Sequence, residues 1–382
     1  MTIGIEGQRL FRVKKHGMDI VALELIRRLT KFDIDNQYVI FVKDDDDKTC
    51  LDESPNVKIC ILPAAPYPVW EQVLLPQAAQ REKCDILHCT SNTAPLFSNI
   101  PIITTLHDII YLEKISILSS QGSHYQRMGN MYRRFIVPGV ARKSKRIVTV
   151  SEFEKVNIER VLGYSDKLRV IHNGVGSHFV KITDFDVLNA ARKKYHLPER
   201  FIFFLGNTDP KKNTINVLKA FAEYQLKHND DLWLVMPDYE ESVLQEMLSR
   251  TVKPDVRDKI RTTGYVPNTE LPAIINQCTM MLYPSLRESF GIPILEGMAC
   301  GVPVITSNTS SMPEIAGDAA LLVDPTSTEA ILEAVEKVMD DPVLASTLSE
   351  KGLQRATVFS WDHMAENYIK LYREVYAEIL NN

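Results

Sequence analysis

Short runs of β-branched and apolar residues alternate along most of the chain with longer segments whose apolar residues recur at helical spacing. Runs of the first kind predict buried strands. Segments of the second kind, Met18–Thr30 and Asn213–Lys227, predict amphipathic helices. Phe359–Leu380 predicts one more helix, which begins at a Ser-Trp-Asp step suited to a helix N-terminus. The predicted strands are QYVIFV, VKICIL, DILHCT, IPIITTLHD, RIVTVS, LRVIHN, RFIFFLG, DLWLVMP, MMLYPS, VPVITS and AALLVD.

This alternation of strand and helix predicts an α/β fold with parallel sheets. The strands are too numerous for one ordinary sheet, and 382 residues exceed the roughly 250–300 at which a single core stops growing. We therefore expect two Rossmann-like, doubly wound domains. The alternation pauses between residues 175 and 195, before RFIFFLG, and the domain boundary is expected there.

Composition excludes several classes of protein. Hydrophobic residues make up 45% and charged residues 24%, as in soluble globular proteins, and no apolar run reaches the ~18 residues of a membrane-spanning helix. The first residues lack the layout of a signal peptide, so a cytoplasmic protein is expected. Six cysteines without a C-x-x-C pair predict buried thiols. The KDDDDK run at 43–48 is interpreted as a solvated turn, in preference to a metal-binding carboxylate pair, and neither a metal nor a cofactor is expected.

Charge is distributed unevenly. Residues 1–175 hold 24 Lys+Arg and 20 Asp+Glu, a balance of +4, whereas the remainder holds 20 and 29, a balance of −9. No acid occurs between Glu113 and Glu152, an interval with eight cations. Such a basic stretch in an otherwise balanced chain is weak evidence for nucleic-acid binding. It favours instead an anionic partner for the N-terminal half.

The segment from Tyr283 to Asp324 holds the strongest candidate site. A strand is followed by a loop and then by a helix that begins near Pro293 and ends before Gly301. The amides of Phe290, Gly291 and Ile292 would lie at the helix N-terminus, which binds anions through its free N–H groups and dipole. Glu288 precedes this position, and Glu296 is expected in the first turn of the helix. Either acid alone would favour the dipole, but beside a phosphate they are also suited to sugar and ribose hydroxyls.

A second phosphate position is predicted at Gly206–Asn213, GNTDPKKN, where another strand end and glycine turn lead into a helix. Lys211 and Lys212 would place point charges near a phosphate. A solvated loop with two lysines is the alternative.

These motifs resemble those of the retaining glycosyltransferases of family 4, which have two Rossmann-like domains facing a cleft (the GT-B fold) and include bacterial mannosyl- and glucosyltransferases. R-E-S-F-G-I-P-I-L-E resembles the family's E-x7-E signature. The resemblance extends in order through IEGQRLF…HGMDIVALELI, TLHDIIYLE, VSEFEKVNIERVLG, RVIHNGV, FLGNTDPKKN, TGYVPNTELPAIINQC and FSWDHMAENYIKLY. It implies an N-terminal acceptor domain, 1–178 plus 360–382, and a donor domain, 179–359, because the last helix of this family crosses back to the first domain.

The resemblance also implies roles for individual residues. Glu288 would bind the hydroxyls of the donor sugar and Glu296 the ribose, while Lys212 and the amides of Phe290–Ile292 would hold the diphosphate. His107 would face the transferred sugar, and Lys212, Glu288 and His107 are the expected catalytic residues. Many family members carry Arg after the glycine where this chain has Asn207, and Lys211 is its expected replacement. The remaining residues expected around the donor are Gly17, Gly206, Tyr265, Val266 and Ser289.

The expected function is transfer of a hexose, with mannose from GDP-mannose as first candidate and a UDP-sugar as the other donor class, to a glycan or lipid-linked acceptor without a metal ion. Lys14, Lys15 and His16 would reach an acceptor phosphate. The basic stretch would contact an anionic membrane surface, and the alternative is a solvated helix whose apolar residues are core. A nucleotide-sugar epimerase, a phosphorolytic pyridoxal enzyme of related fold and a non-catalytic sugar-nucleotide-binding module remain alternatives. The membrane-facing residues expected are Arg127, Arg133, Arg134, Lys143, Lys145 and Arg146.

Overall fold

The computed structural model describes residues 1–113, 124–249 and 254–381, with 124–127 and 254–255 as backbone only. The chain divides into two compact units. Unit 1 comprises Met1–Asn173 and Trp361–Asn382, and unit 2 comprises Gly174–Ser360. The boundary expected after residue 178 lies a few residues beyond the first of these divisions.

Unit 1 is built on a parallel sheet whose strand order is β3-β2-β1-β4-β5-β6-β7 in the described residues. Its strands read as continuous apolar runs because helices cover both faces, as is usual for parallel sheets. Ile3, Ile5, Phe41 and Leu87 are wholly buried. The strands are β1 Thr2–Glu6, β2 Gln37–Lys43, β3 Val57–Leu62, β4 Ile86–Cys89, β5 Ile102–Thr105, β6 Arg146–Thr149 and β7 Leu168–Val170.

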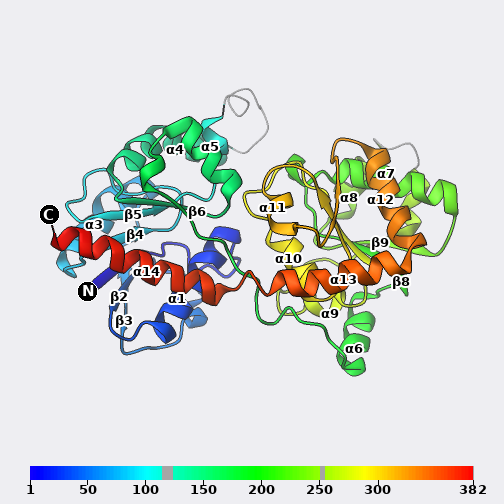
Figure 1. The fold of residues 1–382 in the computed structure, drawn as a ribbon, viewed down its shortest axis with the longest axis horizontal. Helices are drawn as coiled ribbons and strands as arrows, with labels where there is room; N and C mark the ends of the chain where they lie inside the picture. The colour runs from blue at the N-terminus through cyan, green and yellow to red at the C-terminus, as the bar shows by residue number, and fades with distance from the viewer. Residues whose placement is uncertain (114–123, 250–253, 382) are drawn as a thin grey trace. The chain divides into compact units, whose positions relative to one another are not determined.

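The helices of unit 1 follow the amphipathic patterns of the sequence. In α1, Val21, Leu25 and Leu29 are buried at a spacing of four, and the N-terminus is closed by reciprocal hydrogen bonds between His16 and Asp19. Figure 1 shows α4 and α5 on one side of the sheet and α1 with α14 on the other. The helices are α1 Gly17–Phe32, α2 Tyr67–Val69, α3 Leu75–Arg81, α4 His124–Lys143, α5 Glu152–Leu162 and α14 Trp361–Leu380.

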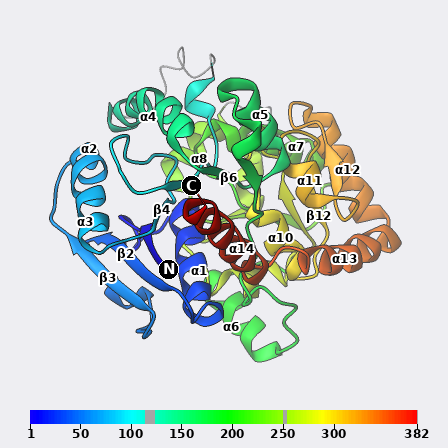
Figure 2. The same cartoon turned by 60° about the vertical axis from the view of Figure 1, so that its left-hand side comes forward.

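The C-terminal helix α14 belongs to unit 1, where it lies beside α1 (Figure 2). A buried polar network fixes it to the sheet. His88 hydrogen-bonds through Nδ1 with Tyr372 Oη (2.7 Å) and through Nε2 with Thr105 Oγ1 (2.8 Å), and Thr105 Oγ1 lies 2.9 Å from Tyr368 Oη. Burial lowers the pKa of His88 to about 3, so this imidazole is neutral at physiological pH.

Unit 2 repeats the same topology. Its strand order in the described residues is β10-β9-β8-β11-β12-β13, with every pair parallel. Its core includes Phe201, Phe203, Leu282 and Ile305. The α/β prediction of two doubly wound units is therefore confirmed. The strands are β8 Arg200–Phe204, β9 Leu232–Met236, β10 Ile260–Thr262, β11 Met280–Tyr283, β12 Val304–Ser307 and β13 Leu321–Val323.

The helices of unit 2 include two packed pairs, α7 with α12 and α10 with α13. The two segments at the ends of unit 2 meet, because Val175 and Ser360 form a parallel bridge and Val175 N donates to Phe359 O (3.1 Å). The helices are α6 Phe185–Tyr195, α7 Thr214–His228, α8 Glu241–Leu248, α9 Leu271–Ile275, α10 Ile292–Ala299, α11 Met312–Ala316, α12 Thr328–Asp340 and α13 Pro342–Ala356.

Some sequence-based predictions need correction. The short strand β10 was missed, because its two polar residues and its place at the sheet edge hide the apolar run that marks a central strand. Helix α14 begins at Trp361, not Phe359. Of the six cysteines, Cys60 is only partly buried, since it lies on an edge strand. The KDDDDK turn is not merely solvated, because Asp47 forms an ion pair with Lys15.

Candidate functional site

In doubly wound sheets, ligands bind at the carboxyl ends of the strands where the strand order reverses. In unit 2 this position lies between β8 and β11. The loop after β8 contains Gly206–Asn213, and the loop after β11 contains Pro284–Gly291. The topology therefore brings together the two phosphate positions predicted from the sequence.

Hydrogen bonds hold these two loops together. Asn213 adopts the left-handed conformation (φ 62°) and is buried, and its Nδ2 donates to Pro284 O (2.9 Å) and Pro325 O (2.6 Å). Leu286 N donates to Lys211 O (2.7 Å). Buried amide bonds of this kind lock a loop, because breaking them leaves polar groups unsatisfied.

Lys212, Glu288 and Tyr283 form a triangle between the loops. Lys212 Nζ lies 2.7 Å from both Glu288 Oε1 and Tyr283 Oη, and Tyr283 Oη donates to Glu288 Oε1 (2.9 Å). The Lys212 and Glu288 side chains are 17% and 12% exposed, so the ion pair is partly desolvated. Burial, followed by the charge of Glu288, raises the pKa of Tyr283, which keeps its hydroxyl protonated as a donor.

The same triangle leaves binding capacity unused. An ammonium group has three donors, and two of those of Lys212 are engaged. Glu288 Oε2 accepts no hydrogen bond from the described residues, because both contacts of the carboxylate use Oε1. One cationic donor and one carboxylate oxygen are thus available to a ligand at this edge.

The N-terminus of α10 lies beside the triangle. Gly291 has φ +101°, a conformation that side chains rarely adopt. The N–H groups of Gly291 and Ile292 have no acceptor among the described residues, as expected for a helix N-terminus that is open to an anion. Ser311 Oγ supports the preceding loop through a shared hydrogen bond, because it lies 2.9 Å from both Glu288 O and Phe290 O.

Glu296 lies in the second turn of α10, not in the first, because the helix begins at Ile292. Its side chain is almost wholly buried and makes no hydrogen bond with the described residues. Burial raises the pKa of Glu296 to about 7, and the charge of Lys212 opposes this shift. A buried carboxyl group without a partner is costly unless a ligand supplies donors.

The other residues expected in unit 2 occupy more ordinary positions. Gly206 passes close to the Phe204 ring, so that an added Cβ would lie 2.3 Å from it. Asn207 uses its side chain to accept from Asp209 N (2.9 Å), and the exposed Lys211 lies 3.8 Å from Asp209. In the loop after β10, Tyr265 is 60% exposed whereas Val266 is buried. Ser289, partly buried, precedes Phe290 in the α10 loop.

In unit 1 the corresponding edge carries His107, two residues beyond β5. His107 Nε2 lies 2.9 Å from Thr90 O, and its backbone N donates to Asn92 Oδ1 (2.6 Å). Because a carbonyl only accepts, Nε2 carries the proton, and Nδ1 is then an acceptor. Burial lowers the pKa of His107, so the ring is neutral at physiological pH.

The basic residues that precede α1 lie in different environments. Lys15 Nζ donates to Arg12 O (2.8 Å) and forms an ion pair with Asp47, which leaves only 8% of its side chain exposed. It is therefore not free to reach an acceptor phosphate as the sequence suggested. Lys14 and His16 are exposed, and nothing lies within 4 Å of the position of a Cβ on Gly17.

The basic face of α4 also differs from the expectation. Arg133 donates to Asn130 Oδ1 (3.1 Å), Arg134 to Tyr111 O, and Lys143 to Leu96 O (2.7 Å). Arg146 pairs with Glu374 (2.7 Å) and Glu378 of α14. Lys145 is exposed, and the side chain of Arg127 lies outside the described residues.

The apolar residues of α4 are not all core. Met128, Met131 and Phe135, spaced to share one helix face, are 68%, 57% and 76% exposed. Within the part of the chain that the structure describes, no helix is long and apolar enough to cross a membrane. The same part shows no group of three or more side chains placed to hold a metal ion.

Comparison with known proteins agrees with this architecture. Residues 16–178 match the family model described as Glycosyltransferase Family 4, and residues 189–355 match that of Glycosyl transferases group 1. The chain belongs to the family 4 glycosyltransferases. In this family 4 chain, the first matched region lies almost wholly in unit 1 and includes His107, and the second lies in unit 2 and includes Lys212, Tyr283 and Glu288.

Similarity to individual proteins is distant but extensive. The family 4 chain is 30% identical to the O-antigen chain mannosyltransferase B of Escherichia coli over 60% of its own length and 61% of that relative. It therefore spans about three fifths of that protein. Its fold matches sucrose-phosphate synthase from Thermosynechococcus elongatus with a TM-score of 0.77 at 19% identity, covering 99% of both chains. It also matches Anabaena HepE in complex with UDP-glucose, with a TM-score of 0.77 at 16% identity, covering 98% and 100%.

Sequence reasoning missed several residues around the two edges. Tyr283 was seen only as the end of a strand. Asn213 was included in the predicted phosphate position Gly206–Asn213, but its bonds to the neighbouring loops were not foreseen. At the unit 1 edge, Arg9 lies over the Tyr67 ring (5.9 Å) and forms no ion pair with the described carboxylates. Glu71, in a π-helical turn at Trp70–Leu74, accepts from Tyr67 (2.8 Å), Thr93, Tyr132 and Gln72, and its burial raises its pKa. The π-turn carries no clear sequence signature, although such turns are frequent at functional sites.

Proposed function

We propose that this family 4 chain transfers a hexosyl group from a nucleotide-sugar donor to a glycan or lipid-linked saccharide acceptor. Mannose from GDP-mannose is the first candidate donor and a UDP-sugar is the second. The observation that carries this proposal is the Lys212–Glu288–Tyr283 triangle beside the open N-terminus of α10. It combines a cationic donor and free amides for a diphosphate with a carboxylate oxygen for a sugar hydroxyl.

The proposed donor would contact three parts of unit 2. The diphosphate would accept from the third donor of Lys212 and from the N–H groups of Gly291 and Ile292. A sugar hydroxyl would donate to Glu288 Oε2. The ribose would donate to Glu296, which supplies the buried carboxyl group with the partners that it lacks. Tyr265 and Val266 would contact the base.

Transfer breaks the bond between the anomeric carbon and the diphosphate and forms a bond from that carbon to the acceptor oxygen. Negative charge grows on the leaving diphosphate, so groups placed to meet this charge stabilise the transition state more than the ground state. In the proposed retaining reaction, the acceptor approaches from the leaving-group side and its proton passes to the diphosphate. Lys212 and the α10 amides would neutralise the leaving group, and on this proposal a metal ion is not required.

Unit 1 would bind the acceptor. His107 is neutral, and its Nδ1 can accept a hydrogen bond from a sugar hydroxyl. Arg9 is a partly buried cation without an ion pair in the described residues, so it can donate to acceptor oxygens where Lys15 cannot.

The exposed apolar face of α4, with the exposed Lys145 and Arg142 near its end, would rest on an anionic membrane surface. On this proposal the protein is cytoplasmic and peripheral to the inner face of the cytoplasmic membrane.

A thermal-shift screen with GDP, UDP and ADP tests the donor proposal. A ligand present at 100 times its dissociation constant adds about 2.7 kcal/mol to the free energy of unfolding. We expect one nucleoside diphosphate to raise Tm, and the matching nucleotide-sugar to be consumed only when a saccharide acceptor is present. Isomerisation of the sugar without acceptor would instead indicate an epimerase, and binding without turnover would indicate a non-catalytic module.

A further inference from the structure

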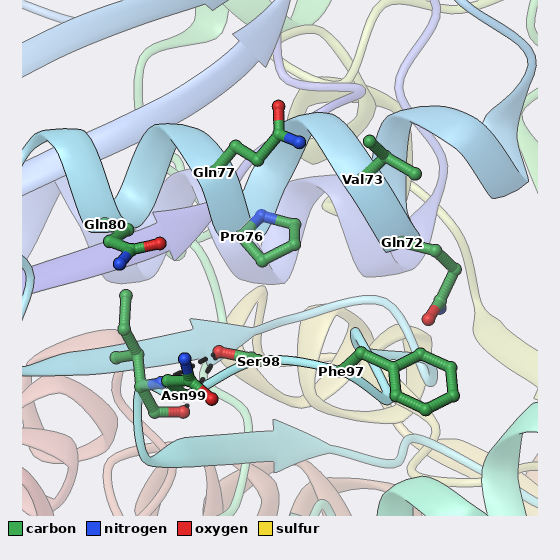
Figure 3. Close-up of a pocket in the computed structure, with 9 residues that line it drawn as sticks. Gln72, Val73, Pro76, Gln77, Gln80, Phe97, Ser98 and Asn99 are labelled. Carbon is green, nitrogen blue, oxygen red and sulfur yellow. Dashed lines mark hydrogen bonds between the residues drawn. The ribbon is translucent and has the colours of Figure 1, made fainter.

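A hollow of about 240 Å³ lies on unit 1, between α3 with the preceding π-helical turn and the segment that leads into β5 (Figure 3). One wall is formed by residues on one side of the helical segment, and the other by a short loop. The hollow lies outside the two edges described above. Its lining residues are Gln72, Val73, Pro76, Gln77, Gln80, Phe97, Ser98, Asn99 and Ile100.

The lining is uncharged but rich in amides. Gln77, Gln80 and Asn99 are exposed, and their side chains form no hydrogen bonds with the described residues. Each amide offers two donors on nitrogen and an acceptor oxygen. These side chains are therefore available to a ligand that carries both donors and acceptors.

An aromatic ring stands beside these amides. Phe97 is 85% exposed although it is large and apolar, and Val73, on the opposite wall, is 43% exposed. In Figure 3 the Phe97 ring lies next to the end of the Gln72 side chain. An exposed aromatic face among free amides suits a ligand that has both apolar and hydroxyl-bearing surfaces.

Hydrogen bonds fix the walls to each other. Gln72 Oε1 accepts from Leu96 N (2.9 Å), and Gln72 Nε2 donates to Ala94 O (3.0 Å). Lys143 Nζ holds the same loop by donating to Leu96 O (2.7 Å). Because the walls are already held, a ligand would not have to order them, and binding would lose little to conformational entropy.

We propose that this hollow is a binding subsite for a neutral saccharide, the part of the acceptor glycan that lies away from the reacting sugar. The inference rests on the proposed glycosyl transfer and extends it. A sugar ring has an apolar face for Phe97 and hydroxyls for Gln77, Gln80 and Asn99. The absence of charged lining residues disfavours an anionic or cationic occupant.

Side-chain contacts link the hollow to the proposed acceptor edge. Gln72 borders the hollow and also donates to Glu71 Oε2 (2.8 Å), and Glu71 accepts from Tyr67, over whose ring Arg9 lies. From Gln72 to Gln80 the helical segment advances about 12 Å at 1.5 Å per residue. This length suits more than one sugar ring, so the subsite would act on longer acceptors and not on a single sugar.

Calorimetric titration tests this inference with mannose and a ladder of neutral α-linked manno-oligosaccharides, without donor. Phe97→Ala is compared with the unaltered protein and with Phe185→Ala, a matched control because Phe185 is 78% exposed in unit 2. We expect affinity to rise along the ladder. Phe97→Ala should raise Kd for the longer sugars by about 3- to 10-fold, the range of one aromatic contact, and leave that for mannose unchanged. The double variant Gln77→Ala plus Gln80→Ala should also raise Kd for the longer sugars.

Equal Kd values for Phe97→Ala and the unaltered protein across the ladder would overturn the subsite, as would a uniform change that includes mannose. If the hollow binds a peptide segment instead, none of the sugars will bind to the unaltered protein. That result would also overturn the saccharide subsite. Titration of the same proteins with the nucleoside diphosphate separates the two proposals. If the unaltered protein binds the nucleoside diphosphate but none of the sugars, this inference is wrong and the donor proposal stands. If the unaltered protein does not bind the nucleoside diphosphate, the proposed function itself is wrong.

Discussion

The two sheets share the order of six strands, but the side chains at their carboxyl edges differ in chemistry. In unit 2, Lys212 and Glu288 form a partly desolvated ion pair, and two free amides stand at the start of α10. In unit 1 the edge carries His107, which is neutral, and Arg9, which has no ion pair in the described residues. A shared fold therefore fixes where ligands bind, while the side chains at that position decide which ligands bind.

The loops at the two edges differ as well. In unit 2 the segment 205–213, which contains the short helical turn Pro210–Lys212, joins β8 to α7, and Asn213 fastens it to the neighbouring loops. In unit 1 the chain between β1 and α1 runs from Gly7 to His16 and ends in the exposed Lys14 and His16. The two segments are nearly equal in length, so the difference lies in their side chains. A braced, charged edge suits a constant group such as a diphosphate, whereas exposed side chains on a surface loop can differ between acceptors.

The largest effect is expected from the charged edge. Lys212→Ala should lower kcat by about 10²–10³-fold, roughly 3–4 kcal/mol, because it removes a cation that meets charge on the leaving group. Lys193→Ala, which changes an exposed lysine of α6 in the same unit, is the matched control and should have a much smaller effect. Steady-state kinetics with the matching donor measures both. Near-normal turnover of Lys212→Ala would contradict the diphosphate role.

The roles of Glu288 and Glu296 can be distinguished by how substitution of each changes stability and nucleotide binding. The folded-state pKa of Glu296, about 7, exceeds its ordinary value of 4.5. The contribution of this one group to folding stability is therefore most favourable below about pH 4.5 and falls as pH rises to about 7. Glu296→Gln should remove this dependence and stabilise the ligand-free protein at about pH 8, by up to about 3 kcal/mol. The same change should weaken nucleoside diphosphate binding by about 10- to 100-fold, because a hydrogen bond to a charged group is lost.

Calorimetry and thermal melts at two pH values provide these measurements. Glu288→Gln is the comparison: it should spare binding of the bare nucleoside diphosphate and impair sugar transfer. Equal losses of nucleotide affinity in both variants would refute the assignment of ribose to one carboxylate and sugar to the other.

Unit 1 should respond to acid through its buried histidine. The pKa of His88 is about 3 in the folded protein and near 6.5 in the unfolded chain, which therefore binds the proton first. The contribution of neutral His88 to the free energy of unfolding should be complete above about pH 6.5. Below that pH it should fall by about 1.4 kcal/mol per pH unit. Urea titrations followed by tryptophan fluorescence report on unit 1 through the buried Trp70 and Trp361. His88→Gln should flatten this pH dependence, whereas His228→Gln in unit 2 should not.

The smallest effect concerns α4. Each cation near an anionic membrane contributes about 1 kcal/mol, and the attraction should fade as the Debye length drops from ~10 Å at 0.1 M salt to ~3 Å at 1 M. Flotation with anionic liposomes should show binding that weakens with salt and with Arg142→Ser plus Lys145→Ser, and that weakens further with Phe135→Ser. The exposed pair Lys181→Ser and Lys193→Ser in unit 2 is the control. Binding that is indifferent to salt and to these changes would exclude the electrostatic mechanism.

Much of the fold could be predicted from the sequence because parallel strands and their helices leave strong local patterns. Nearly every central strand appeared as an apolar run, and the alternation with helices led to two doubly wound units. Two strands were absent from the predicted runs. One is β10, a short edge strand whose pairing with β9 depends on contacts far along the chain. The other is the central strand β1, in which Gly4 separates the two isoleucines. The phosphate-binding loops were visible too, because a strand, a glycine turn and a helix start occupy adjacent residues.

The sequence alone thus determined the fold class and the segments that carry the donor-site chemistry. Only the tertiary structure decided that Lys212 meets Glu288 across 76 residues and that Glu296 is buried with no hydrogen-bond partner among the described residues. It also decided that Lys15 forms an ion pair with Asp47, whereas Arg9 forms none with the described carboxylates. The physical reason is that periodicity and turn chemistry act between near neighbours. Burial, ion pairing and the pKa values that follow from them depend on side chains brought together from distant parts of the chain.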